Sequence, residues 1–137
     1  MSDTPLKIVL RAIELNKTFY SGNQELEVLR KVDLKLEESS SLSIRGDSGC
    51  GKTTLLNLLA RLETGSHGKV CWGEKQMDSI RKPTKHEIGL RANFIGVVYQ
   101  AYYLIPELNV LENVLLPSKI GKKDLNEAKE RSYELLS

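Results

Sequence analysis

The stretch "GDSGCGKTTLL" (residues 46–56) has a glycine, four further residues, a second glycine, and then a lysine and a threonine. This spacing is typical of a loop that binds the phosphates of a nucleotide. Glycines let the backbone curl so that successive N–H groups point inward at the β-phosphate. A helix beginning at Lys52 would add the positive end of its dipole. The alternative, a chance glycine turn before a helix, requires a rare coincidence at ordinary glycine usage.

The polar side chains of the loop suit the same ligand. Lys52 would carry its charge to the β- and γ-phosphate oxygens. Thr53 offers the hard hydroxyl oxygen that Mg²⁺ prefers, and Thr54 offers a second hydroxyl nearer the α-phosphate. The sequence therefore predicts a nucleotide site that also holds Mg²⁺.

Composition limits the other classes of function. The 137 residues are 40% hydrophobic and 28% charged, as in an ordinary globular domain, and we expect one domain at most. The net charge of +2 is too small to indicate a nucleic-acid partner. Cys50 and Cys71 are not spaced as a metal knuckle or redox pair. An unpaired Cys50 inside a phosphate-binding loop suits a reducing compartment, so we expect the protein in the cytoplasm. No apolar run approaches the ~20 residues of a membrane helix, so any role at a membrane would require a partner.

Alternating residues predict strands in the first half of the chain. "KIVLRAIEL" (residues 7–15) and "VLRKVDLKL" (28–36) are expected to form two strands joined by a turn in residues 19–27. "SLSIRG" (41–46) is expected to form a short strand that leads directly into the glycine loop. The leucines of "KTTLLNLLARL" (52–62) predict a buried helix, and "KVCW" (69–72) predicts another strand. The leucines placed on the buried side of that helix are Leu55, Leu56, Leu58, Leu59 and Leu62.

The second half of the chain has weaker signals. Residues 75–85 are polar and basic, which favours a loop and a weak helix, whereas "NFIGVVY" (93–99) predicts a buried strand ending at Gln100. "NVLENVLLP" (109–117) predicts a helix that ends at Pro117, and residues 122–136 predict an amphipathic helix. Its apolar stripe would consist of Leu125, Ala128, Leu135 and Leu136.

Two classes of nucleotide enzyme lack their usual signals. A GTPase would need an Asn-Lys-x-Asp base reader after the loop, but the nearest match, "NKTF" from Asn16, precedes the loop and lacks the aspartate. A small-molecule kinase would usually have an arginine-rich lid, and residues 81–91 are sparse in arginine. Many phosphate-loop enzymes end a buried strand in a Mg²⁺-binding aspartate, where this chain has Gln100. Gln100 is either a neutral ligand near the metal or a solvated residue at a strand end.

The order of these motifs resembles the ATP-binding subunit of ABC transporters. Essentially the whole chain is similar to the N-terminal half of that domain, through "GDSGCGKTTLLNLLARLETGSHGKV" (46–70) and "IGVVYQAYYLIPELNVLENVLLP" (95–117). The segment from Gln100 through "LIPELNVLENV" is most similar to the lipoprotein-releasing and macrolide-export branch (LolD, MacB).

The resemblance assigns roles to individual residues. Phe19 matches the aromatic residue that stacks on adenine, with Tyr20 as a neighbouring candidate; a purely structural aromatic at a strand end is the alternative. Lys52 and Gln100 match catalytic positions, and Thr53 and Gln100 match Mg²⁺ ligands. Residues 102–108 match the surface where a membrane permease docks, although Tyr102, Tyr103 and Leu104 could equally belong to the core. The residues expected to contact ATP are Phe19, Gly46, Asp47, Ser48, Gly49, Cys50, Gly51, Lys52, Thr53 and Thr54.

The resemblance implies an α/β fold, the phosphate-loop core of an ABC ATPase with an antiparallel β N-terminal subdomain. Residues 1–137 would form a partial nucleotide-binding domain, truncated before the signature motif, because the LSGGQ signature, an Asp-Glu strand end and a late histidine are all missing from the sequence.

The implied function is to couple ATP binding and hydrolysis, with Mg²⁺, to export or lipoprotein release. The implied partners are a transmembrane permease and a second ATP-binding subunit, at the inner face of the cell membrane. A non-hydrolysing ATP-binding remnant and another phosphate-loop enzyme such as a kinase are the alternatives.

Overall fold

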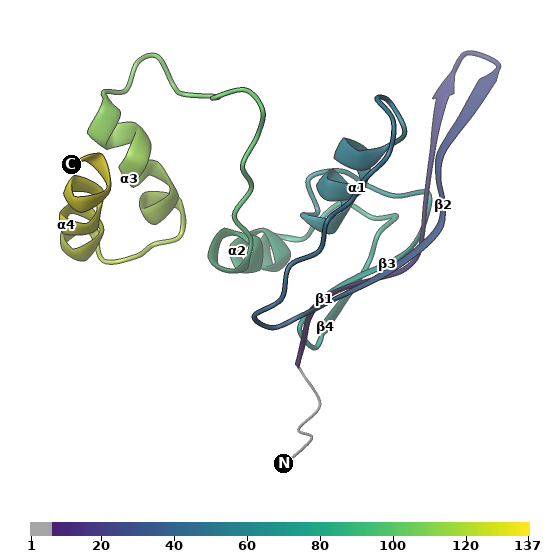
Figure 1. Cartoon of the computed structure of the whole chain (residues 1–137), viewed down its shortest axis with the longest axis horizontal. Coiled ribbons are helices and arrows are strands. Elements are labelled where there is room, and N and C mark those ends of the chain that lie inside the picture. Colours follow the sequence, from purple (N-terminus) through teal and green to yellow (C-terminus); the bar gives the residue numbers. More distant parts are fainter. Residues whose placement is uncertain (1–6) are drawn as a thin grey trace. The chain divides into compact units, whose positions relative to one another are not determined.

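The computed structural model describes residues 7–137, so the first six residues of the expected domain lie outside it. The chain divides into two compact units, one ending at Thr84 and the other spanning Lys85–Ser137. Figure 1 labels their elements. The first unit contains the phosphate-binding loop, and the second contains Gln100.

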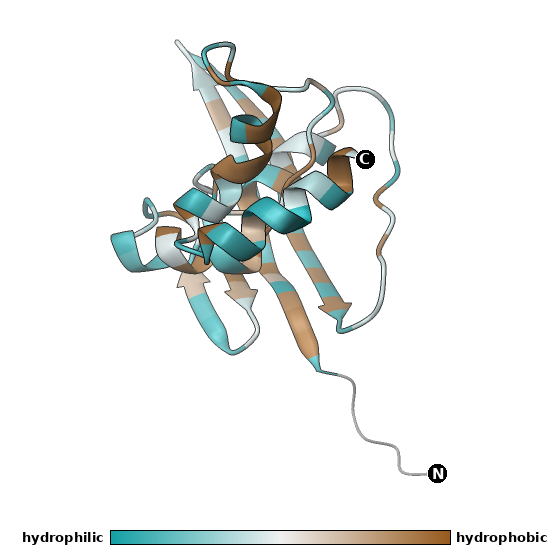
Figure 2. Cartoon of the chain, turned by 90° about the vertical axis from the view of Figure 1, so that its left-hand side faces the viewer, coloured by the Kyte–Doolittle hydropathy of each residue, from teal (hydrophilic) through white to brown (hydrophobic). Residues whose placement is uncertain are grey.

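The first unit is built on a four-stranded antiparallel sheet. Its strands are β1 (Ile8–Ser21), β2 (Gln24–Glu37), β3 (His67–Trp72) and β4 (Lys75–Asp78), in the order β2-β1-β3-β4. The expected strands at residues 7–15, 28–36 and 69–72 are thereby confirmed. The connection of β1 to β2 is shorter than expected, because only Gly22 and Asn23 separate the strands and Gly22 has a φ of 57°. A left-handed residue suits such a two-residue hairpin turn. Figure 2 shows hydrophobic and hydrophilic residues alternating along the long strands.

Helix α1 (Lys52–Leu59) follows the glycine loop, as its leucine spacing predicts. Leu55, Leu58 and Leu59 are buried, and the Trp72 side chain of β3 donates a hydrogen bond of 2.9 Å to the carbonyl of Leu59. Our expectation that every leucine of this segment is buried is wrong, because the helix ends at Leu59 and two leucines remain exposed. The exposed leucines are Leu56 and Leu62.

Three segments differ from the sequence-based expectation. Residues 41–46 and 95–99 form no strand, and Val98 is 99% exposed. A strand is stabilised by hydrogen bonds to a neighbouring strand, and within residues 7–137 neither segment has one. Conversely, residues 75–78, expected as a polar loop, form β4, because β3 offers them an edge to pair with.

The second unit is helical. It contains α2 (Lys85–Phe94), α3 (Val110–Ile120) and α4 (Leu125–Leu136), with α3 and α4 packed together. Helix α3 does not end at Pro117 as expected but continues for three residues beyond it. The expected amphipathic helix α4 is present, yet its apolar side chains Leu125, Leu135 and Leu136 are exposed. None of the helices in residues 7–137 combines the length and the apolar character required to cross a membrane.

Candidate nucleotide-binding site

The phosphate-binding loop, residues 46–54, is exposed at Gly46 and Gly49 and half-buried at Gly51, where it leads into helix α1. Gly49 and Gly51 have φ values of 80° and 96°, in the left-handed region that favours glycine. Gly51 is also the N-cap of α1, and no side chain caps this helix end. The first N–H groups of a helix need an acceptor. A phosphate group at this end would supply oxygens to them and would lie at the positive end of the helix dipole.

A β-bulge in the β1–β2 hairpin lies against the phosphate-binding loop. Lys17 lies opposite Leu29 and Thr18 lies opposite Glu27, so Val28 is the extra residue on β2. A Cβ atom on Gly51 would lie 2.7 Å from Val28 Cγ1 and 3.2 Å from the Val28 carbonyl oxygen. The loop therefore rests on the bulge at a point where only glycine allows the close approach.

The Lys52 ammonium lies within the loop. Its Nζ donates hydrogen bonds to the carbonyl oxygens of Gly46 at 2.8 Å and Asp47 at 2.6 Å, and lies 3.7 Å from Cys50 Sγ. These contacts hold one positive charge beside the backbone that would surround a phosphate group. Phosphate oxygens are acceptors like the carbonyls, so the arrangement suits a charge-assisted contact to an anionic ligand.

The candidate metal ligand lies one residue further along. Thr53 is in the first turn of α1 with an exposed side chain, and Thr54 is half-buried. Within residues 7–137 there is no cluster of three or more histidine, cysteine or acidic side chains that could hold a metal. Mg²⁺ is commonly bound by one or two protein oxygens together with substrate phosphates and water. The Thr53 hydroxyl fits that mode of binding.

The aromatic candidate for the base lies on the same hairpin. Phe19 is 40% exposed and pairs with Leu26 on β2, close along the strands to the bulge that contacts the loop. The Lys17 ammonium lies 4.6 Å from the centre of the Phe19 ring, so one ring face is occupied by a cation. Tyr20, the second candidate, is 72% exposed. The structure thus places Phe19 and the loop in one unit, while its contact with adenine remains a prediction.

Gln100 does not lie at the end of a strand, and this part of our expectation is wrong. It is an exposed residue in the irregular segment between α2 and α3, in the second unit. A role near Mg²⁺ and the γ-phosphate therefore remains a prediction, because it depends on how that unit meets the loop.

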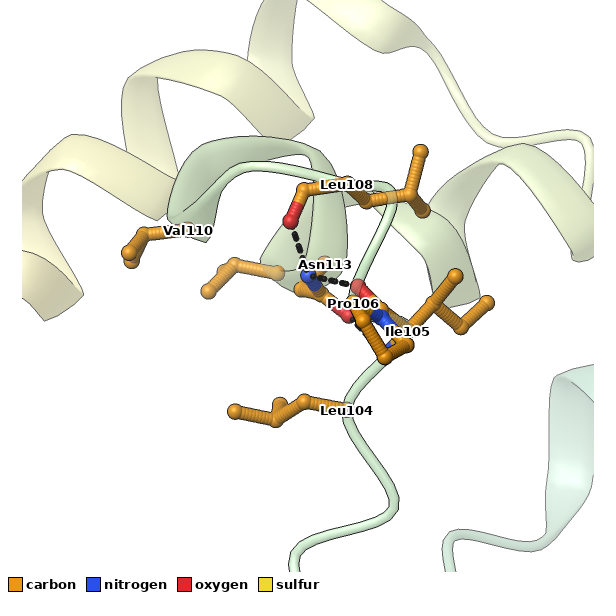
Figure 3. A pocket seen from close by; sticks show the side chains of 7 residues that line it. Leu104, Ile105, Pro106, Leu108, Val110 and Asn113 are labelled. Atoms are coloured by element: carbon orange, nitrogen blue, oxygen red, sulfur yellow. Dashed lines mark hydrogen bonds between the residues drawn. The ribbon is translucent and has the colours of Figure 1, made fainter.

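Residues 102–107 are exposed and Leu108 is half-buried, so the interpretation of Tyr102, Tyr103 and Leu104 as core residues is wrong. Their side chains are 92%, 74% and 67% exposed. Next to them lies a mostly apolar hollow of about 320 Å³ (Figure 3). Its lining consists of Leu104, Ile105, Pro106, Leu108, Val110, Asn113 and Val114.

Asn113 on α3 holds this surface in place. Its Nδ2 donates hydrogen bonds to the carbonyls of Ile105 at 3.1 Å and Leu108 at 2.9 Å, and its Oδ1 accepts one from the Ile105 N–H at 2.9 Å. Figure 3 shows the amide facing the loop backbone. Helix α3 begins with a capping box formed by Asn109 and Glu112.

Sequence reasoning missed three residues of these surfaces. Lys17 could have been noticed because residues two apart on a strand share a face, which places it beside Phe19. Asn113 follows the N-cap residue Asn109 by four positions, one helical turn, which is a weak signal. Val28 carries no signal, since a bulge arises from the pairing register and not from the residue type.

Comparison with known proteins identifies the family. Residues 29–137 match the family model described as ABC transporter. The chain is 38% identical over 130 residues to the lipoprotein-releasing system ATP-binding protein LolD of Buchnera aphidicola, covering 94% of this chain and 56% of that protein. It is 37% identical over 122 residues to LolD of Treponema denticola, covering 89% of this chain and 53% of the relative. The chain therefore spans about half the length of the curated relatives it matches.

Solved structures agree with this assignment. The structure is similar to the ATP-binding cassette MJ0796 in a dimeric, post-hydrolysis state bound to ADP and Pi, with a TM-score of 0.80 and 30% identity. A second dimeric structure of MJ0796, described as a bacterial ABC transporter cassette, gives a TM-score of 0.82 at 30% identity. These matches cover 91% of this chain and 54% of the cassettes. The fold is that of an ABC ATPase, and the chain belongs to the ABC transporter family as a relative of LolD-type ATP-binding subunits.

Proposed function

We propose that this chain binds MgATP in an ABC transporter subunit that couples ATP binding and hydrolysis to lipoprotein release or export through a membrane permease. The observation that carries the proposal is the glycine loop seated on the hairpin bulge, with the Lys52 ammonium held inside it. Family membership supports ATP as the nucleotide. It also leaves the kinase alternative without support.

The proposed ligand contacts follow from the position of each group. Gly46, Asp47, Ser48, Gly49 and Cys50 would surround the β-phosphate with the loop backbone. Lys52 would hold the β- and γ-phosphate oxygens, Thr53 would bind Mg²⁺, and Thr54 would lie nearer the α-phosphate. Phe19 would stack on adenine through its ring face, a contact that is nearly independent of the identity of the base.

Titration of the 137-residue chain with MgATP tests the phosphate site. Lys52→Ala should raise the Kd for ATP by about tenfold or more, because a charge-assisted contact is worth at least about 1.4 kcal/mol. Lys75→Ala, which changes an exposed lysine on β4, is the matched control and should leave the Kd unchanged. Equal ATP affinities for wild type and Lys52→Ala would contradict the proposal.

The permease would dock on residues 102–108 and the adjoining hollow. Exposed Tyr102, Tyr103 and Leu104 beside an apolar depression support a protein contact, since exposed apolar patches of this kind mark interaction sites. Such docking would place the subunit at the inner face of the membrane. Its partner in the catalytic cycle would be a second ATP-binding subunit, as in the dimeric MJ0796 structures.

Leu104→Asp tests the proposed permease contact. It should weaken co-purification with the permease while leaving ATP binding unchanged, and the reverse pattern would contradict the assignment of residues 102–108 as the docking surface.

A further inference from the structure

Lys17 makes three contacts at one point of the first unit. Its Nζ forms an ion pair with Glu63 Oε1 at 2.8 Å, donates a hydrogen bond to the Thr64 carbonyl at 2.7 Å, and lies 4.6 Å from the centre of the Phe19 ring. The Lys17 side chain is 11% exposed and that of Glu63 is 29% exposed. The ammonium is thus directed into the fold, where most lysines would instead extend into solvent.

Burial of this charge requires compensation. A buried ammonium is costly unless an opposite charge and hydrogen-bond acceptors replace its water. Glu63 supplies the charge and Thr64 supplies an acceptor. The remaining direction faces the negative face of the aromatic ring, which attracts a cation. All three partners are needed to explain why the side chain adopts this position.

These contacts connect the aromatic residue to the helix that follows the phosphate-binding loop. Glu63 and Thr64 come shortly after α1, the helix that begins at Lys52. Two further bonds join the same segments: Ser66 N–H donates to the Asn16 carbonyl at 2.8 Å, and Thr18 N–H donates to Ser66 Oγ at 3.0 Å. Phe19 is therefore held relative to α1 at the helix's far end, while Gly51 rests on Val28 at its beginning.

We propose that Lys17 is a positioning residue for nucleobase binding. It orients the Phe19 ring and covers one of its faces, so that the other face is presented to an adenine whose phosphates lie in the loop. The inference rests on the proposed function, because it takes ATP as the ligand. We expect Lys17, held by its ion pair with Glu63, to strengthen the binding of the nucleobase and to have no effect on the binding of the phosphates.

Two ligands separate these parts of the affinity. MgATP reports base and phosphates together, whereas inorganic tripolyphosphate with Mg²⁺ reports the phosphate site alone. Lys17→Met keeps the apolar stem and removes the charge. It should raise the Kd for ATP by about three- to tenfold, the range expected from loss of a desolvated cation–π arrangement. The Kd for tripolyphosphate should remain unchanged.

Five companion variants sharpen the test. Glu63→Gln should act like Lys17→Met, raising the Kd for ATP and leaving the Kd for tripolyphosphate unchanged. Lys17→Arg should recover most of the ATP affinity because it keeps the cation. Arg30→Met is the matched control, since Arg30 forms an ion pair with Glu27 on the same hairpin but is 78% exposed. It should change neither Kd. Phe19→Leu should weaken ATP binding, and adding Lys17→Met to it should have little further effect.

The outcomes distinguish this inference from the proposed function. If Lys17→Met weakens the binding of ATP and of tripolyphosphate equally, or changes neither Kd, Lys17 is not a positioning residue for the base. If Phe19→Leu leaves ATP binding intact, the base does not stack there and the inference also fails. Failure of the proposed function looks different, because Lys52→Ala would then leave both ligands bound as tightly as in the wild type. Unchanged tripolyphosphate binding in Lys17→Met also shows that the variant is folded.

Discussion

Gly51 is subject to two constraints, which arise from different parts of the molecule. Its φ of 96° is a property of the loop, and a glycine adopts it without strain. The contact at 2.7 Å between a Cβ atom at this position and Val28 is a property of the hairpin beneath it. Gly49 has only the first constraint: its φ is 80°, but a Cβ atom added there would have no other atom within 4 Å. Substitutions at these two glycines can therefore distinguish the effect of backbone strain from the effect of steric contact.

Gly51→Ala should destabilise the fold more than Gly49→Ala. For Gly49→Ala we expect a loss of about 1 kcal/mol from the left-handed backbone alone. For Gly51→Ala we expect about 2–4 kcal/mol, because a methyl group must also displace the bulge. Urea unfolding followed by circular dichroism measures both. Equal losses would show that the contact with Val28 does not matter.

The two cysteines should differ in reactivity. Cys50 is exposed in the phosphate-binding loop, whereas Cys71 on β3 is buried. Burial raises the pKa of the Cys71 thiol, although the nearby Arg11 and Lys69 oppose the shift. The raised pKa keeps this thiol protonated, and the thiolate is the reactive form, so its reactivity at a given pH is lower than that of a normal thiol.

Alkylation with N-ethylmaleimide at pH 7.5 should show one fast and one slow thiol, and Cys50→Ser should remove the fast phase. MgATP should slow the fast phase, because the nucleotide would cover the loop. Fast modification of Cys71 in the folded Cys50→Ser variant would contradict the assignment of Cys71 as the slow thiol.

The raised pKa of Cys71 also determines how stability changes with pH. The unfolded chain loses the Cys71 proton at a lower pH than the folded chain, so this group's contribution to the free energy of unfolding decreases as the pH rises through the alkaline range.

At the scale of elements, α3 shows how one side chain organises an irregular segment. Residues 95–109 have no regular secondary structure. The Asn113 amide replaces part of the missing backbone pairing with its bonds to Ile105 and Leu108. The shape of the hollow therefore depends on Asn113, which lies outside residues 102–108, the segment that matches the docking surface.

Asn113→Ala should loosen the docking surface without unfolding α3. Removing the amide takes away its hydrogen bonds to Ile105 and Leu108, each with a net contribution of about 0.5–1.5 kcal/mol. Hydrogen exchange at the Ile105 amide should become faster, while exchange in α4 stays unchanged. Asn109→Ala is the comparison variant, since it removes the helix cap, at about 1 kcal/mol, and should mainly affect the first turn of α3. Unchanged exchange at Ile105 in Asn113→Ala would show that the loop is held by other contacts.

At the scale of the whole molecule, the two units divide the candidate functions. The first unit carries the phosphate-binding loop and Phe19, and the second carries Gln100 and the docking surface. The chain spans 53–56% of the LolD relatives, whose names describe ATP-binding proteins of a lipoprotein-releasing system. In the proposed reaction, nucleotide binding belongs to the first unit and coupling to the permease belongs to the second.

A polypeptide of these 137 residues should bind MgATP but show no ATPase activity above that of the Lys52→Ala variant. The physical reason is that these 137 residues contain no Asp-Glu pair at a strand end to position water and no LSGGQ segment to face the phosphates. A phosphate-release assay at saturating ATP measures this directly. Turnover that is well above background and is lost in Lys52→Ala would show that the chain is a self-contained enzyme.

The local features of the chain were predictable from its sequence. The glycine spacing of residues 46–54, the leucine period of α1 and the alternation in β1 and β2 each reflect short-range geometry. They identified the loop, the helix and the hairpin, and the order of motifs indicated the ABC transporter family, which the comparisons confirm.

Tertiary structure decided which segments have partners. "NFIGVVY" has the composition of a buried strand but forms none, since composition cannot supply a neighbouring strand. Lys75–Asp78 lacks that composition and forms β4, because β3 offers an edge for pairing. Likewise, the bulge at Val28 and the contacts of Lys17 arise from register and packing between distant residues. The sequence by itself determined the chemistry of the phosphate-binding loop, whereas long-range pairing decided what supports that loop and what lies beside it.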